Sequence, residues 1–209
     1  MKPYAIAPRH DAPALVLASG SAIRRTVLEN AGLAFTVDVS AVDEDEVKRG
    51  MREAGASTEA TAEALAELKA TRVSLRHPDA LVIGCDQMLD LDGIWFDKPA
   101  DRDHAFAHLK AMAGKTHRLV GAIVVLRHGK RIWHHVAAAR LTMRPLSDAF
   151  INDYLDAIGD AATKSVGAYQ LEGLGAQLFT RIDGDYFTVL GLSLLPLLNF
   201  LRGHGIVRE

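Results

Sequence analysis

The sequence predicts an α/β fold, and three observations lead to this prediction. Short apolar runs alternate with longer stretches in which apolar residues recur at helical spacing. Turn residues such as Gly, Ser, Asp and Pro bound the apolar runs. No Ser/Gly/Pro-rich linker and no repeat of fixed period divides the chain. Because one core is the default at this length, we expect residues 1–209 to form a single α/β domain of two merged lobes.

The N-terminal part of the chain predicts a strand, a turn, a helix and a second strand. Residues 15–18 are a short buried strand, and Ser19-Gly20-Ser21 is the turn that follows it. The next stretch is expected to be helical to Ala31 and to end at Gly32, since glycine is common just after a helix C-terminus. Residues 35–39 then alternate between apolar and polar side chains, which is typical of a strand.

A long helix is expected over residues 57–77. Leu65, Leu68 and Leu75 recur at helical spacing, and alanine is abundant in this stretch. His77-Pro78 stops the helix, because the residue before a proline disfavours helical geometry.

The rest of the chain alternates strands and capped helices. Residues 81–84 are a third short strand that ends at Cys85-Asp86, and Asp92-Gly93 is a hairpin turn. Asp101 can cap a helix that Gly114 ends. The later elements are strands at 118–127 and 131–143 joined by a turn at 128–130, a helix at 147–158 capped by Ser147, a Gly-rich region at 159–175, a strand pair turning at Asp183-Gly184, and a helix at 192–202.

The charge balance and the cysteine count narrow the classes of partner and compartment. Lys and Arg number 24 against 26 Asp and Glu, so the formal net charge is −2, which disfavours nucleic acid and anionic membrane as partners. The uncharged stretch at 186–201 is too short and broken to span a bilayer, and Arg24-Arg25 make the N-terminus a poor signal peptide. The single cysteine, Cys85, excludes a disulfide framework and indicates a reducing cytoplasm.

The segment 19–25 has the groups that an anion needs. It joins a strand to a helix start and carries Ser19, Ser21, Arg24 and Arg25. Backbone N–H groups at a helix N-terminus, hydroxyls and guanidiniums together suit a phosphate. The alternative is that Ser21 only caps the helix and that the arginines are solvated. The residues alone leave both interpretations open, and the P-loop pattern is absent.

Asp86 is a candidate catalytic or metal-binding carboxylate. It directly follows the strand at 81–84, at the carboxyl end where open α/β sheets place ligands. A carboxylate there can hold a divalent metal or take a proton from water, and the alternative is an ordinary turn residue. For Asp90 and Asp92 the turn role is favoured. The acidic run at 43–46 is expected to be a solvated loop unless folding brings one member near Asp86.

Two lysines could add positive charge to such a site. Lys69 lies at the edge of the apolar stripe of its helix, and the pattern favours a side chain that extends to solvent over one that reaches inward. Lys98-Pro99 lies in a loop where a stiffened backbone could aim the ammonium, although a plain loop lysine is the alternative. The nine His residues show no metal-ligand grouping, and the zinc-protease and serine-hydrolase motifs are absent.

In combination these segments resemble the Maf family of nucleoside triphosphate pyrophosphatases, over nearly the whole chain. Seven short motifs occur in the family's order and spacing, each weak alone and specific together. They are Leu17-Ala18-Ser19-x-Ser21 with Arg24-Arg25, Val42-Asp43-Glu44, Leu65-Ala66-x-x-Lys69-Ala70, Val82-Ile83-Gly84-Cys85-Asp86-Gln87, Lys98-Pro99, Gly167-Ala168-Tyr169 with Glu172-Gly173-x-Gly175, and Ile182-Asp183-Gly184-Asp185-Tyr186 with Val189-x-Gly191-Leu192.

The resemblance implies hydrolysis of a nucleoside triphosphate to its monophosphate and pyrophosphate, assisted by a divalent metal cation, Mg²⁺ or Mn²⁺. Asp86 falls on the position of the catalytic base, and Glu44 on a carboxylate that helps to hold metal or substrate. The implied catalytic set is Glu44, Lys69, Asp86 and Lys98, the implied metal ligands are Glu44 and Asp86, and the implied substrate-binding residues are Ser19, Ser21, Ile23, Arg24, Arg25, Gln87 and Glu172.

Three positions bear on the base of the substrate. The branch of the family that acts on dTTP and UTP usually has Ser-Pro-Arg-Arg, Asp-Thr and Gln-Gly, whereas this chain has Ala22-Ile23-Arg24-Arg25, Asp86-Gln87 and Glu172-Gly173. These residues are similar to those of the branch that acts on 7-methyl-GTP. The base of that nucleotide carries a positive ring charge, which the Glu172 carboxylate can attract. Ala22-Ile23 departs from the Pro-aromatic pair of that branch, and Tyr169-Gln170 follows the other branch.

Other functions stay open beside 7-methyl-GTP hydrolysis. The first is dTTP/UTP hydrolysis within the same family. A nucleotide-binding regulator of septum formation and cell division would bind without turnover, and a phosphomonoesterase would release orthophosphate first. The resemblance also implies a strongly bent mixed β-sheet flanked by helices, two lobes with the site in a central cleft, and a homodimer.

Overall fold

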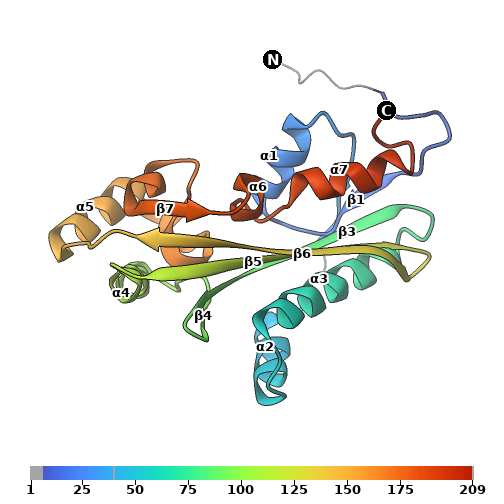
Figure 1. Ribbon diagram of the computed structural model, residues 1–209. Helices are drawn as coiled ribbons and strands as arrows, with labels where there is room; N and C mark the ends of the chain where they lie inside the picture. The colour runs from blue at the N-terminus through green and yellow to red at the C-terminus, as the bar shows by residue number, and fades with distance from the viewer. Residues whose placement is uncertain (1–6, 40, 209) are drawn as a thin grey trace. The chain divides into compact units, whose positions relative to one another are not determined.

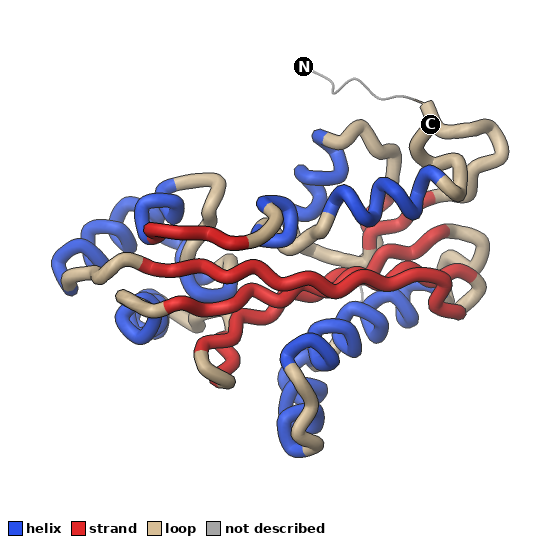
Figure 2. Tube along the Cα trace, viewed as in Figure 1, coloured by secondary structure: helices blue, strands red, loops and turns tan. Residues whose placement is uncertain are grey.

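The computed structural model describes residues 7–39 and 41–208, and its elements are shown in Figures 1 and 2. No helix in this described part is long and apolar enough to cross a membrane. The strands are β1 (Leu15–Leu17), β2 (Thr36–Val37), β3 (Leu81–Leu91), β4 (Ile94–Phe96), β5 (Thr116–Arg127), β6 (Lys130–Met143) and β7 (Phe179–Asp183). The α-helices are α1 (Ala22–Asn30), α2 (Glu44–Glu53), α3 (Thr58–Ser74), α4 (Arg102–Met112), α5 (Asp148–Ile158), α6 (Tyr186–Val189) and α7 (Leu194–Arg202).

The strands of the described chain form one seven-stranded mixed sheet. Their order is β2-β1-β3-β5-β6-β7, and β4 pairs with β3. Strand β1 runs parallel to both β2 and β3, whereas β4 is antiparallel to β3 and β7 is antiparallel to β6. A mixed sheet with flanking helices confirms the predicted α/β class. Strand β2 is shorter than the expected strand at 35–39.

The chain divides into two compact units. The first unit comprises the described parts of Met1–Gln87, Gly121–Ala137 and Gly191–Glu209, and the second comprises Met88–Val120 and Ala138–Leu190. Strands β3, β5 and β6 each begin in one unit and end in the other.

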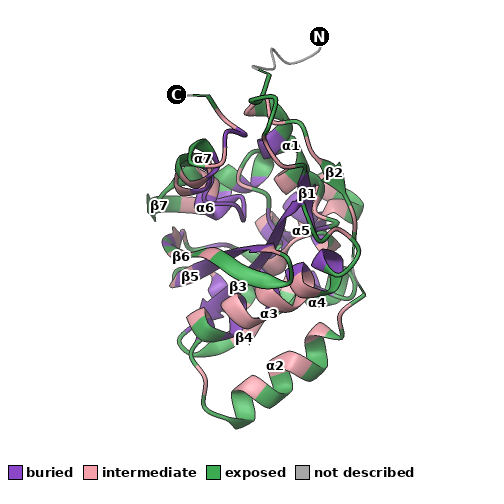
Figure 3. Cartoon of the chain, turned by 90° about the vertical axis from the view of Figure 1, so that its right-hand side faces the viewer, coloured by how far each residue is buried: buried purple, intermediate pink, exposed green. Residues whose placement is uncertain are grey.

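In the first unit, α1 and α7 lie on one face of the strands and α3 lies on the other (Figures 1 and 3). Helix α3 approaches β3 closely at Gly84. A Cβ atom added at Gly84 would lie 2.0 Å from the carbonyl oxygen of Ala66 and 2.8 Å from the Cβ of Ala70. Only a residue without a side chain fits there, so Gly84 sets the distance between the helix and the strand.

The buried face of α3 differs from the predicted leucine stripe. The helix ends at Ser74, and Leu75 is its C-cap with 76% of its surface exposed. Leu65 is fully buried as predicted. The prediction was wrong at Leu75 because this residue lies beyond the last residue of α3 and off the face through which the helix is buried. The buried residues of α3 are Thr58, Thr61, Ala62, Leu65, Ala66, Ala70, Val73 and Ser74.

The acidic run at 43–46 begins a helix, so the prediction of a solvated loop was wrong. The carboxylate of Asp43 accepts a hydrogen bond from the backbone N–H of Glu46 at 2.9 Å and caps α2. Acidic residues in the first turn also interact favourably with the positive end of the helix dipole. The run therefore holds Glu44 at the first position of α2.

The second unit is built around one apolar cluster. Its buried members include Leu89, Leu109, Leu141 and Tyr169, and α4 packs against α5. The predicted caps are confirmed, since Asp101 accepts from the N–H of His104 and Ser147 accepts from the N–H of Phe150.

The hairpin turns also follow the prediction, with one exception. Asp92 and Gly93 both adopt positive φ, at 54° and 85°, as a type I′ turn requires. After β7 the expected second strand is absent from the structure. Asp185 instead accepts from the N–H of Thr188 at 2.7 Å and caps the short helix α6. The strand prediction was wrong because a local side-chain cap starts a helix there.

A buried histidine on β5 contacts a tyrosine that follows the short 3-10 helix Val166–Ala168, within the second unit's core. Nε2 of His117 lies 2.6 Å from the hydroxyl oxygen of Tyr169, and only 1% of the histidine is exposed. Burial lowers the pKa of His117 to about 4, because a charged imidazolium is poorly solvated in an apolar core. The histidine is therefore neutral in the folded protein at neutral pH.

We expect His117 to make the protein less stable as the pH falls. Below about pH 6.5 the unfolded chain binds a proton at this residue, whereas the folded chain does so only near pH 4. Stability is thus lost between these values, by up to about 3 kcal/mol for a shift of this size. The free energy of unfolding measured by urea titration at several pH values checks this. His117→Gln, which cannot titrate, should flatten the pH dependence, and an unchanged slope would contradict the assignment.

Candidate active site

A lysine lies between two carboxylates in the first unit. Nζ of Lys69 is 2.7 Å from Oδ1 of Asp86 and 2.8 Å from Oε1 of Glu44. The Lys69 side chain is 13% exposed and that of Asp86 is 7% exposed, whereas that of Glu44 is 43% exposed. Lys69 reaches inward, so the favoured prediction of a lysine extended to solvent was wrong. One member of the acidic run, Glu44, does come near Asp86, with Lys69 between them.

The close packing of α3 on β3 explains this short distance. Lys69 lies on α3 between Ala66 and Ala70, the two residues that contact Gly84. Asp86 follows Gly84 on β3. Because no side chain at Gly84 separates the two elements, the Lys69 ammonium reaches the Asp86 carboxylate directly.

The segment that leads to Glu44 is held by a second ionic cluster. Asp38 accepts hydrogen bonds from Nε and Nη2 of Arg76 at 2.9 and 2.8 Å, and its Oδ2 lies 2.9 Å from Nε2 of His77. These hydrogen bonds from Arg76 and His77 lower the pKa of Asp38 to about 2. The contacts tie Asp38, which follows β2, to the two residues just after the C-cap of α3, the helix that carries Lys69.

Asp86 lies within a strand, which differs from its predicted place just after one. Strand β3 continues to Leu91, and its parallel pairing with the short strand β1 ends at Ile83 opposite Leu17. Asp86 therefore lies in the part of β3 beyond the end of β1. The prediction of a strand end was wrong because β3 continues past its parallel partner to the hairpin with β4.

One oxygen of the Asp86 carboxylate is buried and has no hydrogen-bond partner among the described residues. This atom, Oδ2, is among the few such buried atoms in the described residues. Within residues 7–39 and 41–208, no three His, Cys, Asp or Glu side chains are grouped closely enough to hold a metal ion alone. The Lys69 ammonium occupies the point that the two carboxylates share, so a Mg²⁺ ion would use the other Asp86 oxygen, Oδ2, and take its remaining oxygen ligands from Glu44, phosphate and water.

Arg24 is fixed close to Asp86 by three acceptors. Its Nη1 donates to the hydroxyl of Ser19 at 3.1 Å and to the backbone carbonyl of Cys85 at 3.0 Å. Its Nε donates to the backbone carbonyl of Gly191 at 2.8 Å. Cys85 directly precedes Asp86, so the guanidinium lies beside the strand that carries the carboxylate.

The other residues of the 19–25 segment take different roles. Ser21 caps α1, with its side chain accepting from the N–H of Arg24 at 3.5 Å. Ser19 is buried, and its hydroxyl accepts from Arg24 and from the N–H of Ser21. Ile23 is partly buried on α1. Arg25 is exposed and pairs with Glu29 at 3.4 Å, so the structure separates it from Arg24.

The neighbours of Asp86 on β3 are Cys85 and Gln87. Cys85 is fully buried, and burial raises the pKa of its thiol to about 11. A thiol with that pKa is a packing group and a poor nucleophile at neutral pH. Gln87 is partly buried, and its Oε1 lies near Gly191.

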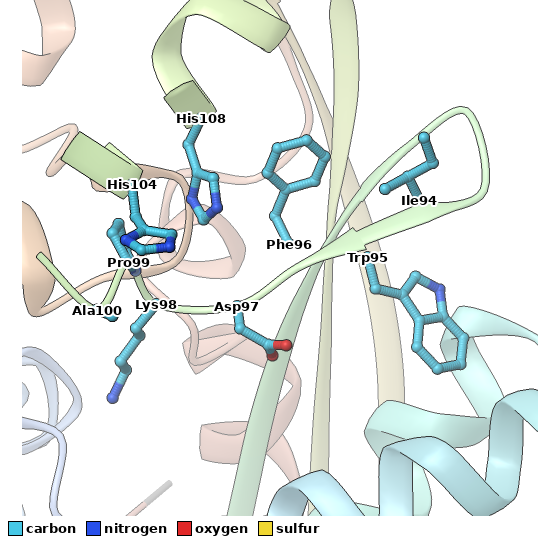
Figure 4. Close-up of a pocket in the computed structure, with 9 residues that line it drawn as sticks. All are labelled: Ile94, Trp95, Phe96, Asp97, Lys98, Pro99, Ala100, His104 and His108. Atoms are coloured by element: carbon cyan, nitrogen blue, oxygen red, sulfur yellow. The ribbon is translucent and has the colours of Figure 1, made fainter. Parts of the chain in front are cut away.

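Lys98 lies in the second unit and lines a pocket of about 360 Å³. Figure 4 shows its side chain extended away from the rings of His104 and His108. Lys98 is exposed, and Pro99 beside it is buried. Strand β4 ends at Phe96 before this loop, and the buried proline and the cap at Asp101 follow Lys98, so the backbone that carries this lysine is held at both ends.

Glu172 also lies in the second unit and is exposed. Its charge adds to burial in raising the pKa of Tyr154 to about 12. Tyr154 donates to the carbonyl of Ala168 at 3.3 Å, and Ser165 donates to the carbonyl of Tyr169 at 2.7 Å. These bonds fix the backbone just before Glu172.

The structure thus groups Glu44, Lys69 and Asp86, with Arg24 and Ser19 beside them. The sequence reasoning missed the parts played by Gly84 and Gly191. Both glycines fall within the motifs of the family resemblance, and each is an isolated glycine among apolar neighbours, but neither signal says which atoms the backbone approaches.

Comparisons with known proteins give a consistent result. Residues 14–204 match the family model described as Maf-like protein. A protein of Paramagnetospirillum magneticum named nucleoside triphosphate pyrophosphatase is 60% identical over 91% of this chain and 98% of its own. A protein of the same name from Rhodospirillum rubrum is 50% identical over 93% of this chain and 96% of its own. A Rhizobium johnstonii protein named 7-methyl-GTP pyrophosphatase is 50% identical over 93% of this chain and 98% of its own.

Proposed function

The chain belongs to the Maf family, and from that premise we propose that it hydrolyses a nucleoside triphosphate to a nucleoside monophosphate and pyrophosphate. The observation that carries the proposal is the contact of Lys69 with both Glu44 and Asp86, next to a buried Asp86 oxygen with no hydrogen-bond partner among the described residues. The relatives named nucleoside triphosphate pyrophosphatase support the same reaction.

In the proposed reaction Asp86 is the general base. It takes a proton from a water molecule whose oxygen then bonds to the α-phosphorus of the substrate. The bond from that phosphorus to the oxygen bridging the α- and β-phosphates breaks, and pyrophosphate leaves with the bonding electrons. The Lys69 ammonium keeps the buried carboxylate paired and oriented before the substrate arrives.

The other cations would bind the triphosphate. Arg24 presents the part of its guanidinium that Ser19, Cys85 and Gly191 leave uncovered, and Lys98 adds an exposed ammonium. Glu44 and Asp86 would hold a divalent cation, Mg²⁺ or Mn²⁺, which when bound offsets negative charge on the leaving pyrophosphate.

We propose 7-methyl-GTP, or a similarly modified nucleotide, as the substrate. Relatives named 7-methyl-GTP pyrophosphatase support this choice, and Glu172 offers an exposed carboxylate to a positively charged base. The proposal also includes a homodimer in a reducing cytoplasm. It is supported by the family resemblance and by a single, buried cysteine that needs no oxidation for folding.

The substrate proposal predicts a ranking of nucleotides. The value of kcat/KM for 7-methyl-GTP should exceed those for GTP, dTTP and UTP. Glu172→Gln should reduce the preference for 7-methyl-GTP over GTP by roughly tenfold, since it removes one charge interaction of about 1.4 kcal/mol. Steady-state assays of pyrophosphate release with the four nucleotides measure both effects. A preference for dTTP or UTP would overturn the substrate proposal, and an unchanged ratio in Glu172→Gln would remove Glu172 from base recognition.

A further inference from the structure

The guanidinium of Arg24 is immobilised by backbone groups. Two of its three acceptors are the carbonyls of Cys85 and Gly191, which belong to the rigid strand β3 and to the segment before α7. The bonds engage Nε and Nη1 and leave Nη2, within the described residues, as the part of the guanidinium that can face a ligand. An arginine fixed in this way loses little side-chain entropy when it binds an anion.

Gly191 has a backbone geometry that only glycine adopts easily. Its φ is 85°, and its carbonyl receives the shortest of the three Arg24 bonds, at 2.8 Å. A Cβ atom at Gly191 would lie 3.3 Å from Nε of Arg24 and 3.4 Å from both Nη2 of Arg24 and Oε1 of Gln87. The guanidinium therefore lies directly against the glycine, and a Cβ atom there would require it to shift by a few tenths of an ångström.

We propose that Gly191 is a positioning residue that aims Nη2 of Arg24 at the phosphates of the substrate. The proposal rests on the proposed function for the identity of the anion, a nucleoside triphosphate. It goes beyond that function because it gives a residue remote in sequence from Arg24 a part in substrate binding. The competing view is that Gly191 only forms the turn between α6 and α7.

Gly93 provides a matched control that separates a turn role from a positioning role. Its φ is also 85°, so alanine there is strained by the same positive φ. It lies in the hairpin turn between β3 and β4, and an added Cβ meets no atom within 4 Å. Gly191→Ala and Gly93→Ala thus share the backbone strain and differ in the contact with Arg24.

The experiment measures the dissociation constant of the α,β-methylene analogue of 7-methyl-GTP with Mg²⁺ by calorimetry. Gly191→Ala should weaken binding about fivefold or more, as expected when a bond that orients a charged donor is disturbed. Gly93→Ala should change binding less than about twofold. In an Arg24→Ala background, adding Gly191→Ala should also change binding less than about twofold, because residues that act through one another are not additive.

The proposal would be overturned if Gly191→Ala weakened binding of the analogue equally in the wild-type and Arg24→Ala backgrounds. It would also be overturned if Gly93→Ala weakened binding as much as Gly191→Ala. If Gly191→Ala fails to fold, Gly191→Asn and Gly93→Asn replace the pair, because asparagine tolerates positive φ and still carries a Cβ.

The analogue cannot be cleaved, so its binding is measured separately from turnover. The predicted coupling without pyrophosphate formation from 7-methyl-GTP, GTP, dTTP or UTP would refute the proposed function and support the positioning role. Pyrophosphate formation without coupling between Arg24 and Gly191 would support the proposed function and refute the positioning role.

Discussion

Asp86→Asn should lower kcat for pyrophosphate release by roughly 10²- to 10⁴-fold, the range that a positioned general base contributes. The amide keeps the size of the carboxylate but cannot take a proton from water. It also removes the negative charge that Lys69 contacts at 2.7 Å. The rate is measured at saturating nucleotide and Mg²⁺, so that weaker binding of either cannot imitate the effect.

Asp90→Asn is the matched control for this substitution. Asp90 lies on the same strand and is similarly buried, at 8% exposed against 5% for Asp86. Its Oδ1 accepts from the N–H of Gly93 in the hairpin turn, a bond that an asparagine oxygen can also accept. We expect kcat to stay within about twofold of wild type, as for a substitution that retains the hydrogen bond. A normal rate in Asp86→Asn would remove Asp86 from the chemistry.

Gly84→Ala should destabilise the protein by about 3 kcal/mol or more, at or above the upper end of the usual cost of overpacking a core. The new Cβ would lie 2.0 Å from the carbonyl oxygen of Ala66, so α3 and β3 must separate. Because these elements carry Lys69 and Asp86, kcat/KM should fall as well. Chemical denaturation gives the stability, and the assay at a temperature where the variant is folded gives the activity.

Gly50→Ala is the control for a glycine substitution in the same unit. Gly50 lies inside α2, and an added Cβ meets no atom within 4 Å. Alanine there should stabilise the helix by about 0.5–1 kcal/mol. The two substitutions are thus expected to have opposite signs. If Gly84→Ala unfolded at the wild-type denaturant concentration, the close packing of α3 on β3 would not set the site.

The elements that could be predicted from the sequence are those fixed by local chemistry. Ser57, Asp101 and Ser147 each accept a hydrogen bond from a backbone N–H in the first turn of their helix, as residues of their types commonly do. The turn at Asp92-Gly93 likewise follows from residues that tolerate positive φ. These features depend on a few neighbouring residues, so the pattern is sufficient to find them.

The sequence-based predictions were wrong where a long-range or competing contact determines the local structure or the direction of a side chain. The acidic pattern at 43–46 is compatible with a solvated loop or with a helix start, and the cap at Asp43 favours the helix. Lys69 was expected to extend to solvent, because its partners Glu44 and Asp86 are far from it in sequence. Tertiary contacts of this kind leave no local pattern.

The candidate site shows the same division. The family resemblance selected Glu44, Lys69 and Asp86, and the structure places all three in contact through the Lys69 ammonium. The family resemblance assigned both Arg24 and Arg25, which are adjacent in sequence, to substrate binding. In the helix the two side chains point in different directions, so one meets Gly191 and the other meets Glu29 at the surface.

The central claim is that this chain breaks the bond between the α-phosphorus and the bridging oxygen of a nucleoside triphosphate. The most direct test follows the products by phosphorus NMR when the wild-type protein and Mg²⁺ are mixed with 7-methyl-GTP, GTP, dTTP or UTP. For at least one nucleotide the account predicts monophosphate and pyrophosphate in equal amounts as the first products. Orthophosphate and a nucleoside diphosphate as first products, or binding of all four nucleotides without any product, would contradict it.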